Sequence, residues 1–275
     1  MEKKQGRVIF CPTPIGNLGD ISLRTIKALR AADRILCEDT RHSGLLLKHL
    51  GISKPLVSYH DHNEKSRTQE VLNWVREGQS LALVTDAGMP GVSDPGGVLI
   101  GALQAEGLAY EVLPGPTAVT TAVVHGNMAQ GRYLFWGFLP AKKGERDRAL
   151  EGLKACPVPL VFYEGPHRIM DLVASLHEVL GDREVVFARE LTKKFEEILR
   201  TRTGAVLDGS VDLRLQGEFV VLVEGAQEEV QEIDIRAALR ERMAGGMKKS
   251  QAVKEVAKTY KLAKNQVYQE SLEIE

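Results

Sequence analysis

Residues 81–97 read LALVTDAGMPGVSDPGG, a short apolar run followed by a loop rich in glycine and proline. An uninterrupted apolar run of this length, at 81–84, is typical of a strand in a parallel sheet whose two faces are covered by helices. The glycines and prolines fix the backbone at the strand's carboxyl end, where open α/β sheets bind their ligands. We therefore expect an α/β fold with a binding loop directly after this strand.

Outward from this stretch, short apolar runs alternate with amphipathic segments through the first 115 residues. The expected strands are 7–11, 34–37, 57–59, 81–84 and 110–113, and the expected helices are 23–31, 45–50, 68–74 and 98–105. Strands that alternate with helices of period 3.6 are the pattern of a parallel α/β domain.

The pattern changes near residue 131, and the second half predicts another α/β or α+β layer. Strands are expected at 133–139, 160–164, 184–189 and 218–224, a helix at 168–180, and polar loops at 140–147 and 192–203. An acidic stretch poor in core residues, 226–232, predicts a linker. We expect three parts: an α/β domain at 1–118, a second α/β domain at 119–226 that completes a cleft, and a small helical module at 227–275.

The composition excludes several classes of protein. The chain has 275 residues, 43% hydrophobic and 27% charged, with a net charge of -1, which is ordinary for a globular protein. Its three cysteines form no C-x-x-C pair, so neither a disulfide framework nor a zinc knuckle is encoded. No stretch approaches the ~18 apolar residues of a membrane span. We expect a cytoplasmic protein that does not contact a membrane.

The charge is unevenly distributed along the chain. Residues 236–264 carry a net charge of +7, so the remainder sums to -8. Within 250–269, apolar residues form two stripes broken near 260–263, which is typical of a helix-turn-helix. A basic helical module suits a polyanion such as RNA, with Lys248 and Lys249 as candidate contacts; a packing or dimer-contact helix pair is the alternative.

Two further loops resemble the one at 85–97 in composition. They read CPTPIGNLGD at 11–20 and LPGPTA at 113–118, and each follows an expected strand. Neither the dinucleotide fingerprint G-x-G-x-x-G nor a phosphate-binding P-loop is present, and any one loop alone could be a simple tight turn. Three such loops at successive strand ends favour close approach by a ligand that carries its own charges and is recognised by backbone groups.

Several separated motifs resemble the tetrapyrrole methylase superfamily: TPIGN at 13–17, TDAGMPGVSDPG at 85–96, LPGPTA at 113–118 and FYEGPHR at 162–168. With EDTRH at 38–42 and YHDHNE at 59–64, the chain is most similar to the branch that methylates the ribose 2′-hydroxyl of a decoding-centre cytidine in 16S ribosomal RNA. The resemblance covers about residues 6–225. The G-x-G-P-G-D turn of the porphyrin enzymes is absent, although a methylase of a tetrapyrrole or other small molecule, or a nucleic-acid-binding regulator acting through the tail, remains an alternative.

The resemblance implies a homodimer that binds S-adenosylmethionine in a cleft between two domains and acts on 16S ribosomal RNA within the small ribosomal subunit. Carried over residue by residue, the cofactor contacts are Ile15, Asp86, Ala87, Gly88, Thr117, Ala118, Tyr163 and Ala188.

A methyl transfer of this kind needs a positioned hydroxyl and a group that takes one proton. The candidate proton acceptors are Asp39 and Glu164, with His167 less favoured, and Arg41 joins Asp39 and Glu164 as a candidate catalytic residue; the alternatives are that Asp39 and Arg41 form a structural ion pair and that Glu164 caps a turn. No metal is expected, because the sulfonium is a good leaving group and no separated further ligand is evident for His60, Asp61 and His62. Candidate RNA contacts in the body are His42, His60, His62, Arg168, Lys193 and Lys194, whose alternative is a solvated surface.

Overall fold

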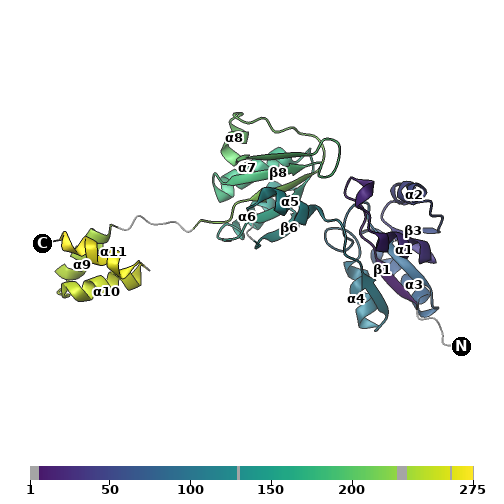
Figure 1. Cartoon of the computed structure of the whole chain (residues 1–275), viewed down its shortest axis with the longest axis horizontal. Coiled ribbons are helices and arrows are strands. Elements are labelled where there is room, and N and C mark those ends of the chain that lie inside the picture. The colour runs from purple at the N-terminus through teal and green to yellow at the C-terminus, as the bar shows by residue number, and fades with distance from the viewer. Residues whose placement is uncertain (1–5, 129–130, 228–233, 261, 275) are drawn as a thin grey trace. The chain divides into compact units, whose positions relative to one another are not determined.

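The computed structural model describes residues 6–128, 131–227, 234–260 and 262–274. These residues form two compact units, Met1–Ala226 and Gln227–Glu275, and each is described by itself (Figure 1). None of the described helices is both long enough and apolar enough to cross a membrane.

The first sheet of the larger unit is parallel throughout, as the sequence predicts. Its strand order is β3-β2-β4-β1-β5. The strands are β1 (Arg7–Phe10), β2 (Arg34–Cys37), β3 (Leu56–Ser58), β4 (Ser80–Val84) and β5 (Ala109–Val112), and the helices are α1 (Leu23–Ala31), α2 (Thr40–His49), α3 (Glu64–Arg76) and α4 (Gly97–Ala105), with a 3-10 turn η1 at Leu18–Asp20.

Helices cover both faces of this sheet, and alternate strand residues point to opposite faces, so both sets are buried. Ile9, Ile35 and Ala82 pack with Leu29 of α1 on one face. Val8, Leu36 and Leu81 pack with Val71 of α3 and Leu99 of α4 on the other face. This double burial explains why β4 is apolar at four consecutive positions.

The order of the strands places a ligand-binding point between β1 and β4. These two strands are neighbours, yet their connections run in opposite directions along the sheet and on opposite faces: β1 connects past β4 to β2 through α1, and β4 connects past β1 to β5 through α4. Loops diverge at such a topological switch point and leave a crevice at the strands' carboxyl ends. The loops at 11–22 and 85–96 both start at this crevice.

The second sheet is mixed, with the order β6-β7-β10-β8-β9. Only β6 and β7 pair in parallel, while the other three pairs are antiparallel. Its strands are β6 (Leu134–Phe138), β7 (Leu160–Glu164), β8 (Glu184–Arg189), β9 (Glu197–Arg202) and β10 (Phe219–Val223). The helices α6 (Lys143–Glu151), α7 (Ile169–Leu180) and α8 (Thr203–Leu207) contribute to the core on one face, and α5 (Ala118–Gly126) covers the other.

The structure corrects the two loops expected at 140–147 and 192–203. Helix α6 begins inside the first, and strand β9 lies inside the second. Helix α6 has a weak apolar pattern because its buried face uses Arg146, whose Nε donates to Ser175 Oγ at 2.9 Å, beside Leu150. Strand β9 is a polar edge strand that pairs only with β8, so it lacks the apolar run of a central strand.

Several helix boundaries also differ from those expected. Helices α2 and α3 begin earlier than 45 and 68, because their first turns are polar and only their later turns carry the apolar stripe. Helix α5 occupies residues 118–126, where no helix was expected, and it begins at the last residue of the third loop.

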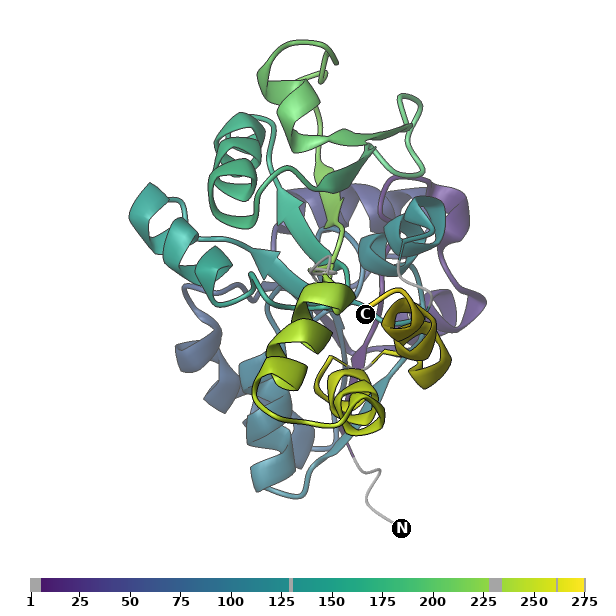
Figure 2. The ribbon, with the colours of Figure 1, turned by 90° about the vertical axis from the view of Figure 1, so that its left-hand side faces the viewer.

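The second unit consists of three helices, α9 (Ile235–Ala244), α10 (Lys249–Thr259) and α11 (Lys264–Leu272), coloured yellow-green to yellow in Figure 2. They pack around Leu239, Val253, Val256 and Val267. The two predicted apolar stripes form α10 and α11, and α9 completes their core. Most of the expected linker, 228–232, lies outside the described residues.

Candidate cofactor site

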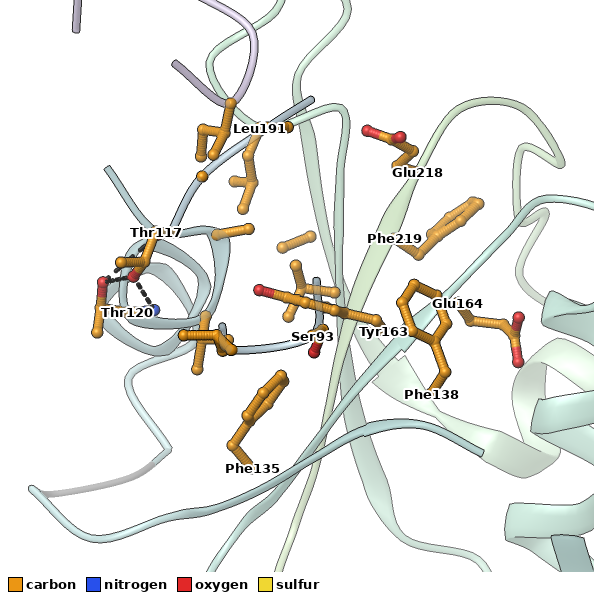
Figure 3. Close-up of a pocket in the computed structure, with 18 of the residues that line it drawn as sticks. Ser93, Thr117, Thr120, Phe135, Phe138, Tyr163, Glu164, Leu191, Glu218 and Phe219 are labelled. Atoms are coloured by element: carbon orange, nitrogen blue, oxygen red, sulfur yellow. Dashed lines mark hydrogen bonds between the residues drawn. The ribbon is translucent and has the colours of Figure 1, made fainter. Parts of the chain in front are cut away.

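A cavity of about 620 Å³ lies in the larger unit, between loops of the first sheet and strands of the second (Figure 3). Its size falls in the range of pockets that hold small molecules. The first-sheet loops contribute Ile15, Ala87, Gly88, Thr117 and Ala118. The second sheet contributes Tyr163 and Ala188. Seven of the eight residues expected to contact the cofactor therefore line this one cavity.

The first two loops are joined by backbone hydrogen bonds. Thr13 N–H donates to Gly88 O at 2.9 Å, and Gly88 N–H donates to Thr13 O at 3.1 Å. Gly88 has a φ of +83°, and a Cβ there would lie 3.4 Å from Ile15 Cγ2. A side chain at position 88 would thus be strained and would narrow the cavity. The two loops therefore form one wall of the cavity, and their backbone groups are available to contact a ligand.

The third loop ends in a helix N-terminus at the cavity. Thr117 is the N-cap of the nine-residue helix α5, and its Oγ1 accepts a hydrogen bond from Thr120 N–H at 3.3 Å. Tyr163 packs against the apolar cluster that contains Val119 of α5, and burial raises the pKa of Tyr163 to about 12. Tyr163 therefore stays neutral and is held against the first turn of α5, whose partial positive charge suits a carboxylate.

The second-sheet wall of the cavity contains more aromatic residues than the sequence predicts. Tyr133, Phe135, Phe138 and Phe219 line the cavity beside Tyr163. The sequence signal was present in the aromatic run of β6, but strand alternation predicts only half of those rings on one face. A planar adenine or nucleobase fits such a wall.

Acidic side chains give the second loop a negative potential. Burial raises the pKa of Asp94, a cavity-lining residue, and the charges of Asp61 and Asp86 act in the same direction. Burial also raises the pKa of Glu38, with Asp86 and Asp94 contributing. Negative charge at this position favours a cationic ligand such as a sulfonium. Asp94 belongs to the TDAGMPGVSDPG motif but was not among the residues predicted to form the site.

The three residues expected to be catalytic lie in different surroundings. Asp39 caps α2 and accepts hydrogen bonds from Arg41, at 2.7 Å from its N–H and 2.9 Å from Nη2. Hydrogen bonds from the Arg41 guanidinium lower the pKa of Asp39 to about 2. Neither residue is part of the cavity wall. Asp39 N–H donates to Asp86 Oδ1 at 3.4 Å, which ties α2 to the second loop; Asp86 itself does not line the cavity.

Glu164 belongs to the cavity wall, but Figure 3 shows its carboxylate pointing away from Tyr163. Its Oε1 accepts a hydrogen bond from Gly165 N–H at 2.9 Å, and its Oε2 lies 3.2 Å from Arg168 Nη2. Burial raises the pKa of Glu164. The sequence left open whether Glu164 is catalytic or caps a turn. Its side chain holds the turn before Pro166, and the residue also lies beside the cavity, so its position is compatible with both roles.

The residues expected to contact RNA divide into held and exposed side chains. Arg168 Nη2 donates to Leu139 O at 2.7 Å, and Lys193 Nζ donates to Glu190 and Glu218 at 2.8 and 3.0 Å. Lys249 Nζ donates to Ile274 O at 2.8 Å. Exposed side chains are His42, His62, Lys194 and Lys248. The half-buried His60 lies with its ring 5.9 Å from that of His62, and within the described ranges no three potential metal ligands gather.

Comparisons with known proteins identify the family of this chain. The family described as Tetrapyrrole (Corrin/Porphyrin) Methylases matches residues 7–207, and the RsmI C-terminal HTH domain matches residues 229–275. Proteins named Ribosomal RNA small subunit methyltransferase I are similar to nearly the whole chain. The one from Escherichia coli O157:H7 is 42% identical over 99% of this chain and 96% of its own. The one from Synechocystis sp. is 40% identical over 98% of this chain and 99% of its own.

Solved structures share the fold at lower identity. The uroporphyrin-III C-methyl transferase from Thermus thermophilus, complexed with S-adenyl homocysteine, has a TM-score of 0.57 and 21% identity, and the match covers 79% of this chain and 97% of that one. The cobalt precorrin-4 methyltransferase CbiF has a TM-score of 0.56 and 20% identity, over 80% and 95% of the two chains. From the family match and the full-length relatives, this chain belongs to the tetrapyrrole methylase family of S-adenosylmethionine-dependent methyltransferases, in the branch of ribosomal RNA small subunit methyltransferase I.

Proposed function

We propose that this chain transfers the methyl group of S-adenosylmethionine to the ribose 2′-hydroxyl of a decoding-centre cytidine in 16S ribosomal RNA. The observation that carries the proposal is similarity over the whole chain, tail included, to proteins named for small-subunit ribosomal RNA methylation. A match confined to the two α/β domains would leave the substrate open, because one fold hosts many reactions.

The lining of the cavity supports the proposed binding of this cofactor. Ile15, Ala87 and Gly88 would hold it on one side and Thr117 and Ala118 on another, with Tyr163 and Ala188 closing the wall. The cofactor supplies an activated methyl group whose leaving group is a neutral thioether. The chain has to bind and orient the cofactor, place the hydroxyl in line with the methyl group, and accept one proton.

We propose that Asp94 accepts the proton of the ribose hydroxyl. It lines the cavity, and its raised pKa makes it a stronger base than an ordinary aspartate. Asp39 has a lowered pKa and is a weaker base, so we propose that the Asp39–Arg41 pair orients the RNA backbone beside the cavity. Glu164 fixes the turn at Gly165 and Arg168, and its loss should lower turnover through that turn.

The proposed substrate is 16S ribosomal RNA within the small subunit, bound by a homodimer. Residues 1–118 and 119–226 would form the two sides of the cleft, and 227–275 would hold the RNA. Five of the proposed RNA contacts have side chains that no carboxylate or carbonyl of the described residues holds in place: His42, His60, His62, Lys194 and Lys248. Arg168, Lys193 and Lys249 would act mainly through the side chains and carbonyls they hold.

The test is transfer of a labelled methyl group from S-adenosylmethionine to purified small subunits that lack the modification, followed by nuclease digestion and mass analysis. We expect the label on one cytidine ribose in the decoding centre. Label on a base would contradict the proposed acceptor atom. Absence of label from both subunits and free 16S RNA, with the cofactor still bound, would contradict the substrate and would direct attention to tetrapyrroles and other small acceptors.

A further inference from the structure

The edge strand β6 contains a β-bulge beside the cavity. Phe135 pairs with Val161 and Gly137 pairs with Phe162, so Trp136 is an extra residue with no partner on β7. Gly137 has a φ of +85°, a backbone conformation that side chains other than glycine rarely adopt. A Cβ at this position would also lie 3.3 Å from Ser93 Oγ, in the second loop. The bulge is therefore fixed by the glycine and by the neighbouring loop.

The bulge turns two phenylalanines toward the same neighbour. Residues three apart in a regular strand point to opposite faces, so Phe135 and Phe138 should lie on different sides of β6. Instead their rings lie 5.0 and 5.5 Å from the Tyr163 ring, in edge-on geometry, and both line the cavity. Bulges near functional sites commonly redirect a side chain in this way.

The two rings differ in exposure. Phe135 is half-buried, whereas Phe138 remains 56% exposed although it lines a cavity. An exposed aromatic ring at the edge of a cavity is an unfilled binding surface, because its burial by a ligand would release water from apolar area. Phe138 contributes little to the core of the fold, and its placement is better explained by a ligand that arrives from solvent.

The position of Phe138 favours the RNA over the cofactor. Figure 3 shows Thr117 on one side of Tyr163 and Phe138 on the other. The glycine-rich loops, with the helix N-terminus and the acidic side chains, provide the polar groups that a charged cofactor needs. Phe138 offers only an apolar face. Proteins that recognise unpaired RNA bases stack them on such aromatic side chains.

We infer that Phe138 stacks on the base of the nucleotide whose ribose is methylated, and so holds that nucleotide outside the RNA stack. The inference rests on the proposed function and adds the side chain that captures the base. A nucleotide that leaves its helix to bring its ribose hydroxyl into a cavity gives up the stacking contacts of its base, and an aromatic stacking partner compensates for them.

The test compares Phe138→Ala with Trp136→Ala in methyl transfer to small subunits, with the wild-type chain assayed in parallel. Trp136 is a matched control, since it is an aromatic residue of the same strand, is 45% exposed, and does not line the cavity. Stacking is worth about 1–3 kcal/mol per base, so Phe138→Ala should lower kcat/KM for RNA by about 5- to 150-fold. The Kd for S-adenosylmethionine should stay within about twofold, Trp136→Ala should have little effect, and Phe138→Tyr should restore activity.

Phe138→Leu provides a second variant that keeps an apolar side chain and removes the ring, and thermal unfolding of each variant checks the fold. Equal losses in the Phe138 and Trp136 variants would overturn the inference. So would a loss in Phe138→Ala that is matched by weaker cofactor binding, which would place the ring in the cofactor site. If the wild-type chain methylates no RNA, the proposed function fails and this inference fails with it; a wild-type chain that is active makes the Phe138 comparison an independent test.

Discussion

Asp94, the proposed proton acceptor, should lower the stability of the folded chain when its carboxyl is ionised. Because its folded-state pKa is raised, the protonated form is favoured in the folded chain and the ionised form is destabilising. Asp94→Asn should therefore raise the Tm at pH 7–8, and this gain should disappear below about pH 4, where the carboxyl is protonated in both states. As a proton acceptor, Asp94 should be required for turnover, so the same variant should lose about 100-fold or more in kcat.

Asp61→Asn is the control for this prediction. Asp61 raises the pKa of Asp94 through its charge but is not part of the cavity wall. Its removal should shift the acid limb of the pH–rate profile to lower pH while leaving the maximal rate close to wild type. Thermal unfolding and rates measured across pH 5–9 would show both effects. A stabilised Asp94→Asn variant with unchanged kcat would remove Asp94 from the proposed chemistry.

The sequence predicted those cavity residues whose position follows from the end of a strand. Ile15, Gly88 and Thr117 follow strands directly, so the strand ends bring them together; their contact with the cofactor stays a prediction. The orientation of Phe138 depends on a β-bulge, and the hydrophobic periodicity of the sequence does not predict the extra residue of a bulge. The partners of Lys193 depend on tertiary contact, since Glu218 is distant in sequence. Sequence alone therefore could not tell a held lysine from a free one.

At the scale of elements, the loop after β8 joins the second sheet to the first βα turn. Asn17 N–H donates to Thr192 Oγ1 at 3.1 Å. Glu190 and Thr192 both have positive φ, at 51° and 65°, which costs free energy that surrounding contacts must offset. Ile15 and Leu191, one from each segment, line the cavity. The fit between these two segments should therefore set the width of the cofactor site.

Gly16→Ala tests that fit. A Cβ at residue 16 would lie 2.5 Å from Lys193 Cγ and 2.8 Å from Thr192 Oγ1, so the turn and the loop must separate. Overpacking of this kind costs about 1–3 kcal/mol of folding stability, so Gly16→Ala should lower the Tm. Because the separated segments carry Ile15 and Leu191 of the cavity wall, we also expect the Kd for S-adenosylmethionine to rise in calorimetric titration. Gly19→Ala is the matched control in the same turn, where a Cβ meets only Asn17 Oδ1 at 3.2 Å. Similar affinities for the two variants would show that this contact does not shape the site.

Elements with one polar face were the hardest to predict. Strand β4 is covered on both sides, so its apolar run is continuous and its assignment was correct. Strand β9 lies at a sheet edge and carries charges on its outer positions, so its sequence resembles a polar loop. The pairing of β9 with β8 through six residues comes from tertiary structure that the local sequence does not encode.

At the scale of the whole molecule, an acidic body is joined to a basic tail, and the tail's charges are not equivalent. Arg236 is paired with Glu270 and Glu273, at 2.6 and 2.8 Å. Lys254 and Lys258 lie one turn apart on α10, exposed and away from its buried residues. Within 234–260 and 262–274, neither lysine has a carboxylate at ion-pair distance, so both are available for phosphates.

We therefore expect Lys254→Gln/Lys258→Gln to weaken binding of 16S RNA and to reduce its salt dependence. Each lost phosphate contact lowers the slope of log Kd against log salt by about 0.7 to 0.9, so the double variant should lose about 1.5. Binding of S-adenosylmethionine should not change, because the cavity lies wholly within the larger unit. Filter binding or fluorescence anisotropy over 50–300 mM salt measures both the affinity and the slope.

Arg236→Gln separates local contact from overall charge. It also removes one positive charge from the tail, but from a side chain already engaged by two carboxylates. If phosphates contact the exposed face of α10, this variant should leave the slope close to wild type. If the slope of log Kd against log salt falls by the same amount per removed charge in Arg236→Gln and in the lysine double variant, net charge alone attracts the RNA. An unchanged slope in the lysine double variant would assign the tail a packing or dimer-contact role and would leave the larger unit to bind the RNA.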